Sequence, residues 1–163
     1  TSTGILGFSE EPVYPTIEVN KISVKFVKSH PDAKTPIYAS DGAACFDLFC
    51  VEDAKVYQDH PVTVKTGIKM EIPDGYVMLL FSRSSQAFKY DTRLSNCVGV
   101  IDSDYRGEVN IRLVRDTEGF YEISKGDRIG QAMVIPISPV TFEEVDQLSG
   151  TIRGEGGFGS TGK

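Results

Sequence analysis

The stretch PVTVKTGIKMEIPDGYVMLLF, residues 61–81, decides the fold class. Its first half places apolar or small side chains on every second position, which is the period of a β-strand with one buried face. These positions are Val62, Val64, Thr66, Ile68, Met70 and Ile72. Pro73-Asp74-Gly75 then predicts a turn, because proline fixes φ and glycine accepts positive φ. The apolar run that follows to Phe81 predicts the next strand.

The same alternation recurs on both sides of this stretch. It appears at residues 22–26 and 109–113, and each run ends at turn-forming residues. Short strands separated by frequent turn signals predict an all-β sandwich or barrel. One short helix is expected over Ser84 to Tyr90, with a serine at its cap. We find no internal repeat and no second domain.

Composition limits the classes of function. The chain has 163 residues, the size of one domain. It carries 17 basic and 23 acidic residues, a net charge of −6. Nucleic-acid binders are usually basic, so no nucleic-acid partner is expected, whereas a small anion remains possible if a few arginines gather at one place. The longest apolar runs reach six residues, against the roughly 20 of a membrane helix, so no membrane span is expected.

The two ends differ from the middle. Residues 1–20 contain prolines and no basic residue, so we expect a loose N-terminal arm without a leader peptide. Residues 21–148 form the expected β domain. Residues 149–163 hold six glycines and predict a segment that is mobile by itself. The three cysteines, Cys45, Cys50 and Cys97, show no CxxC spacing and fit reduced thiols, so a cytoplasmic location is expected.

The glycine-rich end also contains groups that bind anions. Residues 157–163 fill only part of a phosphate-binding GxxxxGK(S/T) loop, because the sequence stops at Lys163. However, glycine backbone N–H groups can form an anion-binding nest, Arg153 adds a planar cation and Phe158 a stacking face. The alternative is a flexible polar end.

Two further segments could carry chemistry. In residues 99–107, an apolar pair before Asp102 would set this carboxylate at the edge of the core, where partial burial improves a general base. The alternative is an ordinary turn. In residues 82–85, Arg83 and three serines at the start of a short helix could bind an anion. The alternative is a capped helix with an arginine in solvent.

In their order along the chain, these segments resemble five motifs of the homotrimeric dUTP pyrophosphatase (dUTPase) family. The motifs span nearly the whole chain and are residues 44–48 (ACFDL), 82–85 (SRSS), 99–107 (GVIDSDYRG), 126–131 (GDRIGQ) and 153–162 (RGEGGFGSTG). Each alone is weakly specific, and the five together are strong. The resemblance implies a distorted jelly-roll or β-barrel subunit with one short helix, assembled as a homotrimer with active sites between subunits.

The resemblance also implies a reaction and its site. The family hydrolyses dUTP to dUMP and pyrophosphate, which keeps uracil out of DNA and supplies dUMP for dTMP synthesis. Asp102 would be the general base for water attack on the α-phosphorus. Mg²⁺, held mainly by the substrate phosphates, would contact Asp47 through water. The phosphate chain would be bound by Arg83, Ser84, Ser85 and Gln131, the nucleoside by Asn96, Gly99, Val100 and Tyr105, and a lid from a neighbouring subunit would supply Arg153, Phe158, Gly159, Ser160 and Thr161.

The chain departs from the family pattern at four positions. Cys45 and Ser85 stand where the family usually has glycine, and Gly130 and Ala132 stand where it has larger residues. Two rival readings remain open: a dCTP deaminase-like enzyme of the same fold, and a regulatory protein that senses dUTP. The first predicts ammonia release from dCTP, and the second predicts dUTP binding without turnover.

Overall fold

The computed structural model describes residues 21–159. The predicted N-terminal arm and residues 160–163, which include Ser160 and Thr161, lie outside the described residues. Within the described range the chain forms eleven strands and one short helix, which confirms the all-β prediction. Their bounds are β1 Lys25–Lys28, β2 Ile37–Tyr38, β3 Phe46–Phe49, β4 Ala54–Tyr57, β5 Val62–Glu71, β6 Tyr76–Phe81, α1 Ser84–Tyr90, β7 Thr92–Leu94, β8 Gly99–Ile101, β9 Glu108–Arg115, β10 Phe120–Ile123 and β11 Arg128–Pro136.

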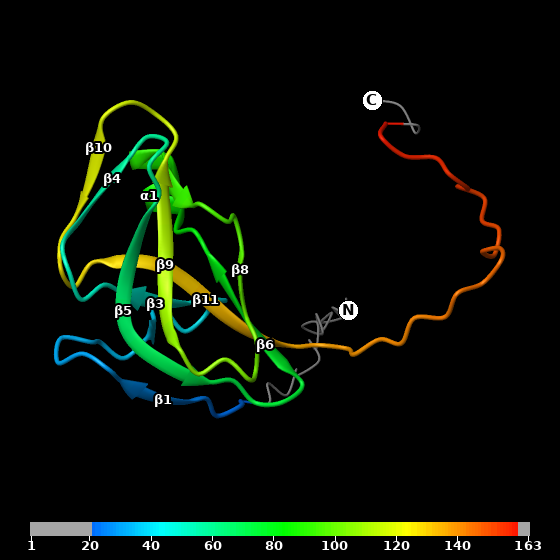
Figure 1. The fold of residues 1–163 in the computed structure, drawn as a ribbon, viewed down its shortest axis with the longest axis horizontal. Coiled ribbons are helices and arrows are strands. Elements are labelled where there is room, and N and C mark those ends of the chain that lie inside the picture. The colour runs from blue at the N-terminus through cyan, green and yellow to red at the C-terminus, as the bar shows by residue number, and fades with distance from the viewer. Residues whose placement is uncertain (1–20, 160–163) are drawn as a thin grey trace, which may run out of the picture.

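The strands build two larger sheets and one ribbon. The first sheet has the order β1-β5-β9-β7, the second β2-β3-β11-β6-β8, and β4 pairs with β10 in the ribbon. All neighbouring strands of the sheets are antiparallel. The larger sheets enclose a common interior, and the ribbon lies at one end of it (Figure 1). Within residues 21–159 no helix has the length and apolar character that crossing a membrane requires.

Strand β5 bears out the alternation in its sequence. Val64, Thr66, Ile68 and Met70 are all buried, because one face of the strand looks into the core. The pairing with β9 shifts between Lys65 and Lys69, so β5 is irregular there. At the irregularity Gly67 has φ +66° and a Cβ would lie 2.8 Å from Cβ of His30. Glycine is therefore required at this position for both conformation and space.

Helix α1 begins and ends where the sequence predicts, but its cap is different. The N-cap residue is Arg83 in extended conformation, and its side chain makes no capping hydrogen bond. Ser84 already belongs to the helix, so the expected serine cap is wrong. At the other end Asp91 takes a left-handed conformation with φ 48° and ends the helix.

The C-terminal segment leaves the body at the end of β11. The N–H of Ile137 donates to the carbonyl of Gly75 at 2.9 Å, and residues 138–159 then run away from the sheets without a strand or helix (Figure 1). We call residues 137–159 the tail. It begins well before Ser149, where the sequence placed the start of the glycine-rich lid.

Candidate active site

The first group of predicted residues, which we call the phosphate half, gathers where β3, β11 and the start of α1 meet. Asp47 on β3 is opposite Gln131 on β11, and the two therefore share one face of the sheet. The amide of Gln131 donates from Nε2 to the carbonyl of Ser82 at 2.9 Å. This bond ties β11 to the segment that enters α1.

Asp47 is the buried acid of the phosphate half. Its residue exposure is 7%, and its carboxylate is paired with two arginines. Nε of Arg83 lies 3.5 Å from Oδ1, and Nε of Arg128 lies 3.3 Å from Oδ2. A carboxylate this far from water requires such partners, because an unpaired buried charge is costly. The guanidinium of Arg83 also donates to the carbonyl of Arg128 at 3.3 Å.

The serines of the second motif lie in the first turn of α1. Ser84 is exposed and Ser85 is half-buried. Neither Ser85 nor Cys45 has positive φ, so non-glycine residues fit at both positions. Gly130 packs with its Cα against Ile111, whose Cδ1 would lie 3.2 Å from an added Cβ. Ile111 thus fills the space of a larger residue.

The second group, which we call the nucleoside half, follows β8 and its flanking loops. Gly99 is pressed on Leu80, where a Cβ would lie 2.8 Å from Cδ1 of the leucine, so only glycine lets β8 pair this closely with β6. Val100 faces outward and is 60% exposed. Asn96 lies exposed in the turn before β8. The half therefore presents an open strand edge with backbone groups and few side chains in the way.

Asp102 lies in the tight turn after β8. The N–H of Tyr105 donates to its carbonyl at 3.2 Å, and Arg106 donates to the carbonyl of Ser103 at 2.6 Å. Tyr105 is held by its hydroxyl, which donates to the carbonyl of Glu108 at 2.9 Å. Asp102 itself is exposed. The expectation that it sits partly buried at the core edge is wrong for the single chain, because the turn carries it outward.

The two halves do not meet within one chain. Gly99 is opposite Leu80 on β6, and Ile101 is opposite Met78. Asp102 therefore follows the Met78 end of β6, whereas Arg83 follows the other end. Asp102 is level with Val77, six residues before Arg83. With a rise of about 3.3 Å per residue, the backbones of Asp102 and Arg83 are on the order of 20 Å apart.

The third group lies on the tail, away from both halves. Arg153, Phe158 and Gly159 are all exposed, and the relative exposure of Phe158 is 114%. Arg153 forms a local turn, with Nε donating to the carbonyl of Gly156 at 2.7 Å. Phe158 and Gly159 both have positive φ, 49° and 88°. The structure therefore brings the predicted residues together in three separate groups.

The site has no protein-built cage for a metal ion. Among residues 21–159, no three His, Cys, Asp or Glu side chains gather as potential ligands. Asp47 is engaged by two arginines instead. Asp47 supplies a carboxylate oxygen, the type of ligand that Mg²⁺ prefers, but this one group could only complete a coordination shell that other donors provide.

One residue of this cluster was absent from the predicted site: Arg128. Gln131 of the same motif was predicted, but residues three apart on a regular strand face opposite sides. A register shift between Arg128 and Gly130 puts Arg128 opposite Phe49, on the face of Asp47. A β-bulge therefore brings Arg128 to the face of Asp47, and no pattern in the sequence marks this bulge.

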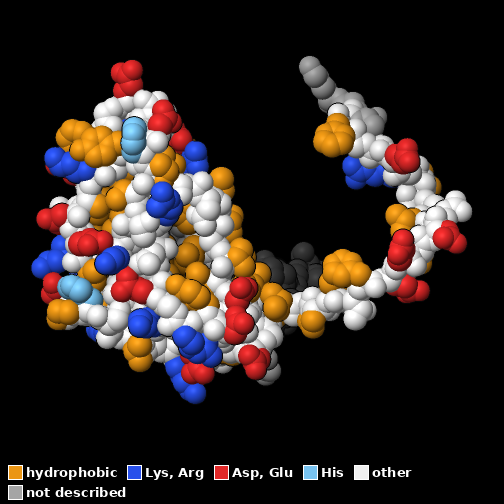
Figure 2. Space-filling model, in the orientation of Figure 1, with side chains coloured by type: hydrophobic (Ala, Val, Ile, Leu, Met, Phe, Trp, Pro, Cys, Tyr) orange, Lys and Arg blue, Asp and Glu red, His pale blue; other side chains and the backbone are white. Residues whose placement is uncertain are grey.

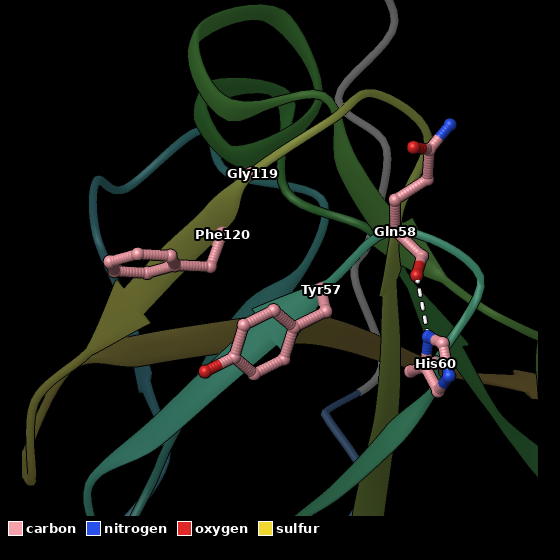
Figure 3. A pocket seen from close by; sticks show the side chains of 5 residues that line it. All are labelled: Tyr57, Gln58, His60, Gly119 and Phe120. Carbon is pink, nitrogen blue, oxygen red and sulfur yellow. Dashed lines mark hydrogen bonds between the residues drawn. The ribbon is translucent and has the colours of Figure 1, made fainter.

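An exposed aromatic hollow lies elsewhere, on the β4–β10 ribbon. Figure 3 shows Tyr57 and Phe120 side by side, with His60 bonded to the carbonyl of Gln58 at 2.9 Å. The predicted site residues do not line this hollow. It is therefore separate from the three groups.

The chain is similar to known proteins along most of its length. Residues 31–162 match the dUTPase family. A deoxyuridine 5′-triphosphate nucleotidohydrolase of Hydrogenobaculum is 43% identical over 143 residues, which cover 87% of this chain and 98% of the relative. A dUTPase mutant of Staphylococcus bacteriophage 80alpha, solved with dUpNHpp, has a TM-score of 0.81 at 27% identity and covers 86% of this chain and 99% of its own.

A second solved structure shows the same fold at greater distance. A dUTPase mutant from phage phi11 of S. aureus, described for its coordination of a structural Mg(II) ion, has a TM-score of 0.71 at 22% identity. It covers 77% of this chain and 97% of its own. The extent of the family match and the identity to the bacterial relative together show that this chain belongs to the dUTPase family.

Proposed function

We propose that this protein hydrolyses dUTP to dUMP and pyrophosphate. The observation that carries the proposal is the phosphate half, in which Arg83 and Arg128 surround Asp47 beside the serines of α1. Partly exposed guanidinium groups at one place suit a polyphosphate, because they form charge-assisted hydrogen bonds to its oxygens. Family membership narrows this polyphosphate to dUTP.

The active site would be assembled from three subunits. Within one chain Asp102 and Arg83 follow opposite ends of β6, too far apart to act on one phosphorus atom. The tail extends from the body and carries Phe158 fully exposed (Figure 1). A homotrimer would resolve both facts by placing the nucleoside half of one subunit, the phosphate half of a second and the tail of a third around each substrate.

Asp102 would act as the general base. Its carboxylate would accept a proton from a water molecule aligned for in-line attack on the α-phosphorus. Arg83, with Ser84, Ser85 and Gln131, would hold the phosphate chain, and this positioning contributes to the rate by fixing the angle of attack. The leaving group would be pyrophosphate.

The nucleoside half would select the base and the sugar. Asn96 and the backbone at Gly99 and Val100 would pair with the edge of uracil. Cytosine exchanges one acceptor and one donor on that edge, and each unsatisfied buried group costs about 1 to 3 kcal/mol. A narrow strand edge would exclude the methyl group of thymine by steric clash. Tyr105 would lie under the deoxyribose and leave no room for a 2′-hydroxyl.

Magnesium would enter as part of the substrate. The phosphate oxygens would hold the ion, and Asp47 would contact it through water. When bound, Mg²⁺ supplies charge neutralisation for the departing pyrophosphate.

The glycine-rich part of the tail would act as a lid. Ordering the ten residues from Arg153 to Gly162 costs on the order of 10 to 20 kcal/mol. Burial of Phe158 on the uracil returns only about 1.5 to 3 kcal/mol. Contacts of Arg153, Gly159, Ser160 and Thr161 with a full triphosphate would be needed as well. The lid would therefore favour substrate over product.

The decisive experiment is an assay of the full-length protein with dUTP and Mg²⁺, in which pyrophosphate release is measured. We expect release, and dCTP should yield no ammonia. Binding of dUTP without release would instead support a sensor, and ammonia from dCTP a deaminase. The relatives compared above bear hydrolase names, which gives the deaminase reading no support.

A matched pair of variants tests the role of Asp102. Asp102→Asn keeps the shape of the side chain and removes its basicity, so turnover should fall by about 10² to 10⁴ while nucleotide binding persists. Asp74→Asn makes the same charge change in an exposed turn outside the site and serves as the control. Parental turnover in Asp102→Asn would mean that another group activates the water.

A further inference from the structure

The phosphate half contains an unequal charge pairing. One carboxylate, that of Asp47, faces two guanidinium groups from different strands and segments. Its side chain is 10% exposed, whereas those of Arg83 and Arg128 are 24% and 41% exposed. The acid is therefore more deeply buried than either of the two cations that it pairs with.

A β-bulge makes this arrangement possible. In a regular register Ile129 would lie opposite Phe49 and would point to the Asp47 face of the sheet. The extra residue at the bulge lets Ile129 turn into the core, where its exposure is 0%, while Arg128 takes the place opposite Phe49. One short segment thus supplies both a core side chain and a cation beside Asp47.

The backbone carbonyl and the guanidinium of Arg128 make further contacts that fix its position. Its carbonyl accepts hydrogen bonds from Nη1 of Arg83 at 3.3 Å and from Nε2 of the buried Gln86 at 3.4 Å. Its guanidinium lies over the ring of Phe49, with Cζ 5.8 Å from the centroid. The position of Arg128 is therefore defined by the protein before any substrate arrives, which limits the reorganisation needed for binding.

The two ion pairs compete for the same acid. If Arg83 alone faced Asp47, the pair would be neutral and Arg83 would offer a phosphate little net attraction. With Arg128 present, two positive charges share one negative charge, and the cluster retains a net positive charge toward solvent. The recess beside it is lined by both arginines, Ser85 and Lys89, and also by Asp127, whose negative charge offsets that of Lys89. The excess of positive charge in the recess therefore comes from the two arginines.

We infer that Arg128 is a positioning residue for the proposed reaction: by pairing with Asp47 it leaves the charge of Arg83 available to the phosphate chain. The inference rests on the proposed function for the identity of the substrate. It adds a role for a residue of β11 that the predicted site did not contain.

The test measures binding of the imido analogue dUpNHpp to the full-length protein in EDTA, so that no magnesium contact of Asp47 contributes. Arg128→Gln should weaken binding by about 10- to 100-fold, as expected for the loss of one charged hydrogen-bonding interaction, because Asp47 then neutralises Arg83. Arg128→Lys, which keeps the charge, should restore part of this loss. Arg112→Gln is the matched control, because it makes the same charge change on β9. There Nη1 of Arg112 donates to Oγ1 of Thr63 at 3.0 Å.

The double variant Asp47→Asn with Arg128→Gln separates charge balance from simple structural support. Removing the acid as well frees Arg83, so the double variant should bind the analogue more tightly than Arg128→Gln alone, by at least about threefold. If Asp47 and Arg128 only hold strands together, the double variant will bind no better than the single one. That result would overturn the inference.

Two further measurements keep the inference falsifiable. If Arg128→Gln does not fold, as judged by circular dichroism, Asp47→Asn alone carries the test: tighter analogue binding in EDTA supports the inference and weaker binding overturns it. In Mg²⁺, Arg128→Gln should raise KM for dUTP more than it lowers kcat. If the parental protein releases no pyrophosphate from dUTP, the proposed function is wrong. If the parental protein does turn over dUTP, and Arg128→Gln binds the analogue as tightly as the parental protein does, only the inference is wrong.

Discussion

The body of this chain, residues 21–136, buries many of its apolar side chains, whereas the tail exposes them. In the body, Leu48 and Ile111 are each 1% exposed and pack between the two larger sheets. In the tail, Phe142 is 96% exposed and Phe158 is 114% exposed. Figure 2 shows such orange side chains along the tail, where it stands apart from the rest of the molecule. The same residue types therefore form a core in one region and face water in the other.

The body covers its own apolar side chains, whereas the tail leaves them open to contact with another molecule. Exposed aromatic and aliphatic side chains in a row mark surfaces that other molecules cover. The tail offers Val140, Phe142, Val145 and Leu148 before the glycine-rich residues begin. Changes in the body should therefore act first on stability, and changes in the tail should act on assembly and turnover.

Deletion of residues 153–163 is the strongest test of this contrast between the body and the tail. We expect turnover of dUTP to fall by about 10³-fold, equivalent to about 4 kcal/mol of transition-state stabilisation, because the lid would supply several charged contacts. The melting temperature should stay within a few degrees of the parental value, since the hydrogen bonds of the described residues 153–159 are local. Normal turnover in the shortened protein would show that the tail is not part of the site.

The reciprocal change is Leu48→Ala in the body. Leu48 lies on β3 next to Asp47 and is fully buried. Truncating such a side chain costs about 2 to 5 kcal/mol of unfolding free energy, because transfer energy is lost and a cavity remains. Urea unfolding measures this loss. A stability change below about 1 kcal/mol would contradict the view that the body alone carries the core.

The sequence predicted the body better than it predicted the site. Strand β5 follows the period of two on both sides of its irregularity at Gly67, because one side of the strand faces the core there. Helix α1 was bounded correctly, but its cap was not, since the extended conformation of Arg83 depends on how β6 enters the helix. Such cap geometry is a property of the connection and not of the residue types.

The parts of the site that escaped prediction depend on register and on assembly. Arg128 reaches Asp47 only because of the bulge opposite Phe49, and a bulge leaves no fixed pattern in one sequence. Asp102 was expected at the core edge, but the turn after β8 exposes it. In the proposed trimer, residues of another subunit would surround Asp102. The periodicity of its own strand says nothing about those residues.

Assembly can be probed by making the tail polar. Phe142→Ser with Leu148→Ser removes two exposed side chains, each worth about 1.5 to 3 kcal/mol when fully buried. If neighbouring subunits cover them, the trimer should dissociate at higher protein concentration than the parental protein does, as measured by analytical ultracentrifugation. Thermal unfolding of the dissociated body should still be cooperative. An unchanged association equilibrium would mean that these side chains stay in water in the assembled protein.

The smallest expected effect lies in the body, at Cys50. Its thiol is fully buried and donates to the carbonyl of Ser124 at 3.1 Å. Burial raises the pKa of the Cys50 thiol above its ordinary value. In the unfolded chain a thiol has a pKa near about 8.5. The contribution of this group to stability is therefore fully present below that pH and is lost as the pH rises through the folded pKa.

Measuring unfolding of the parental protein and of Cys50→Ala at several pH values isolates this contribution. Between pH 7 and 9.5 the parental protein should lose stability relative to the variant, by at most about 1.4 kcal/mol, because its thiol releases a proton at lower pH in the unfolded state than in the folded state. The cavity left by the alanine is the same at every pH and cancels in the comparison. A difference that stays constant with pH would mean that the thiol can ionise in place, and the body would then be open to water where the structure shows it closed.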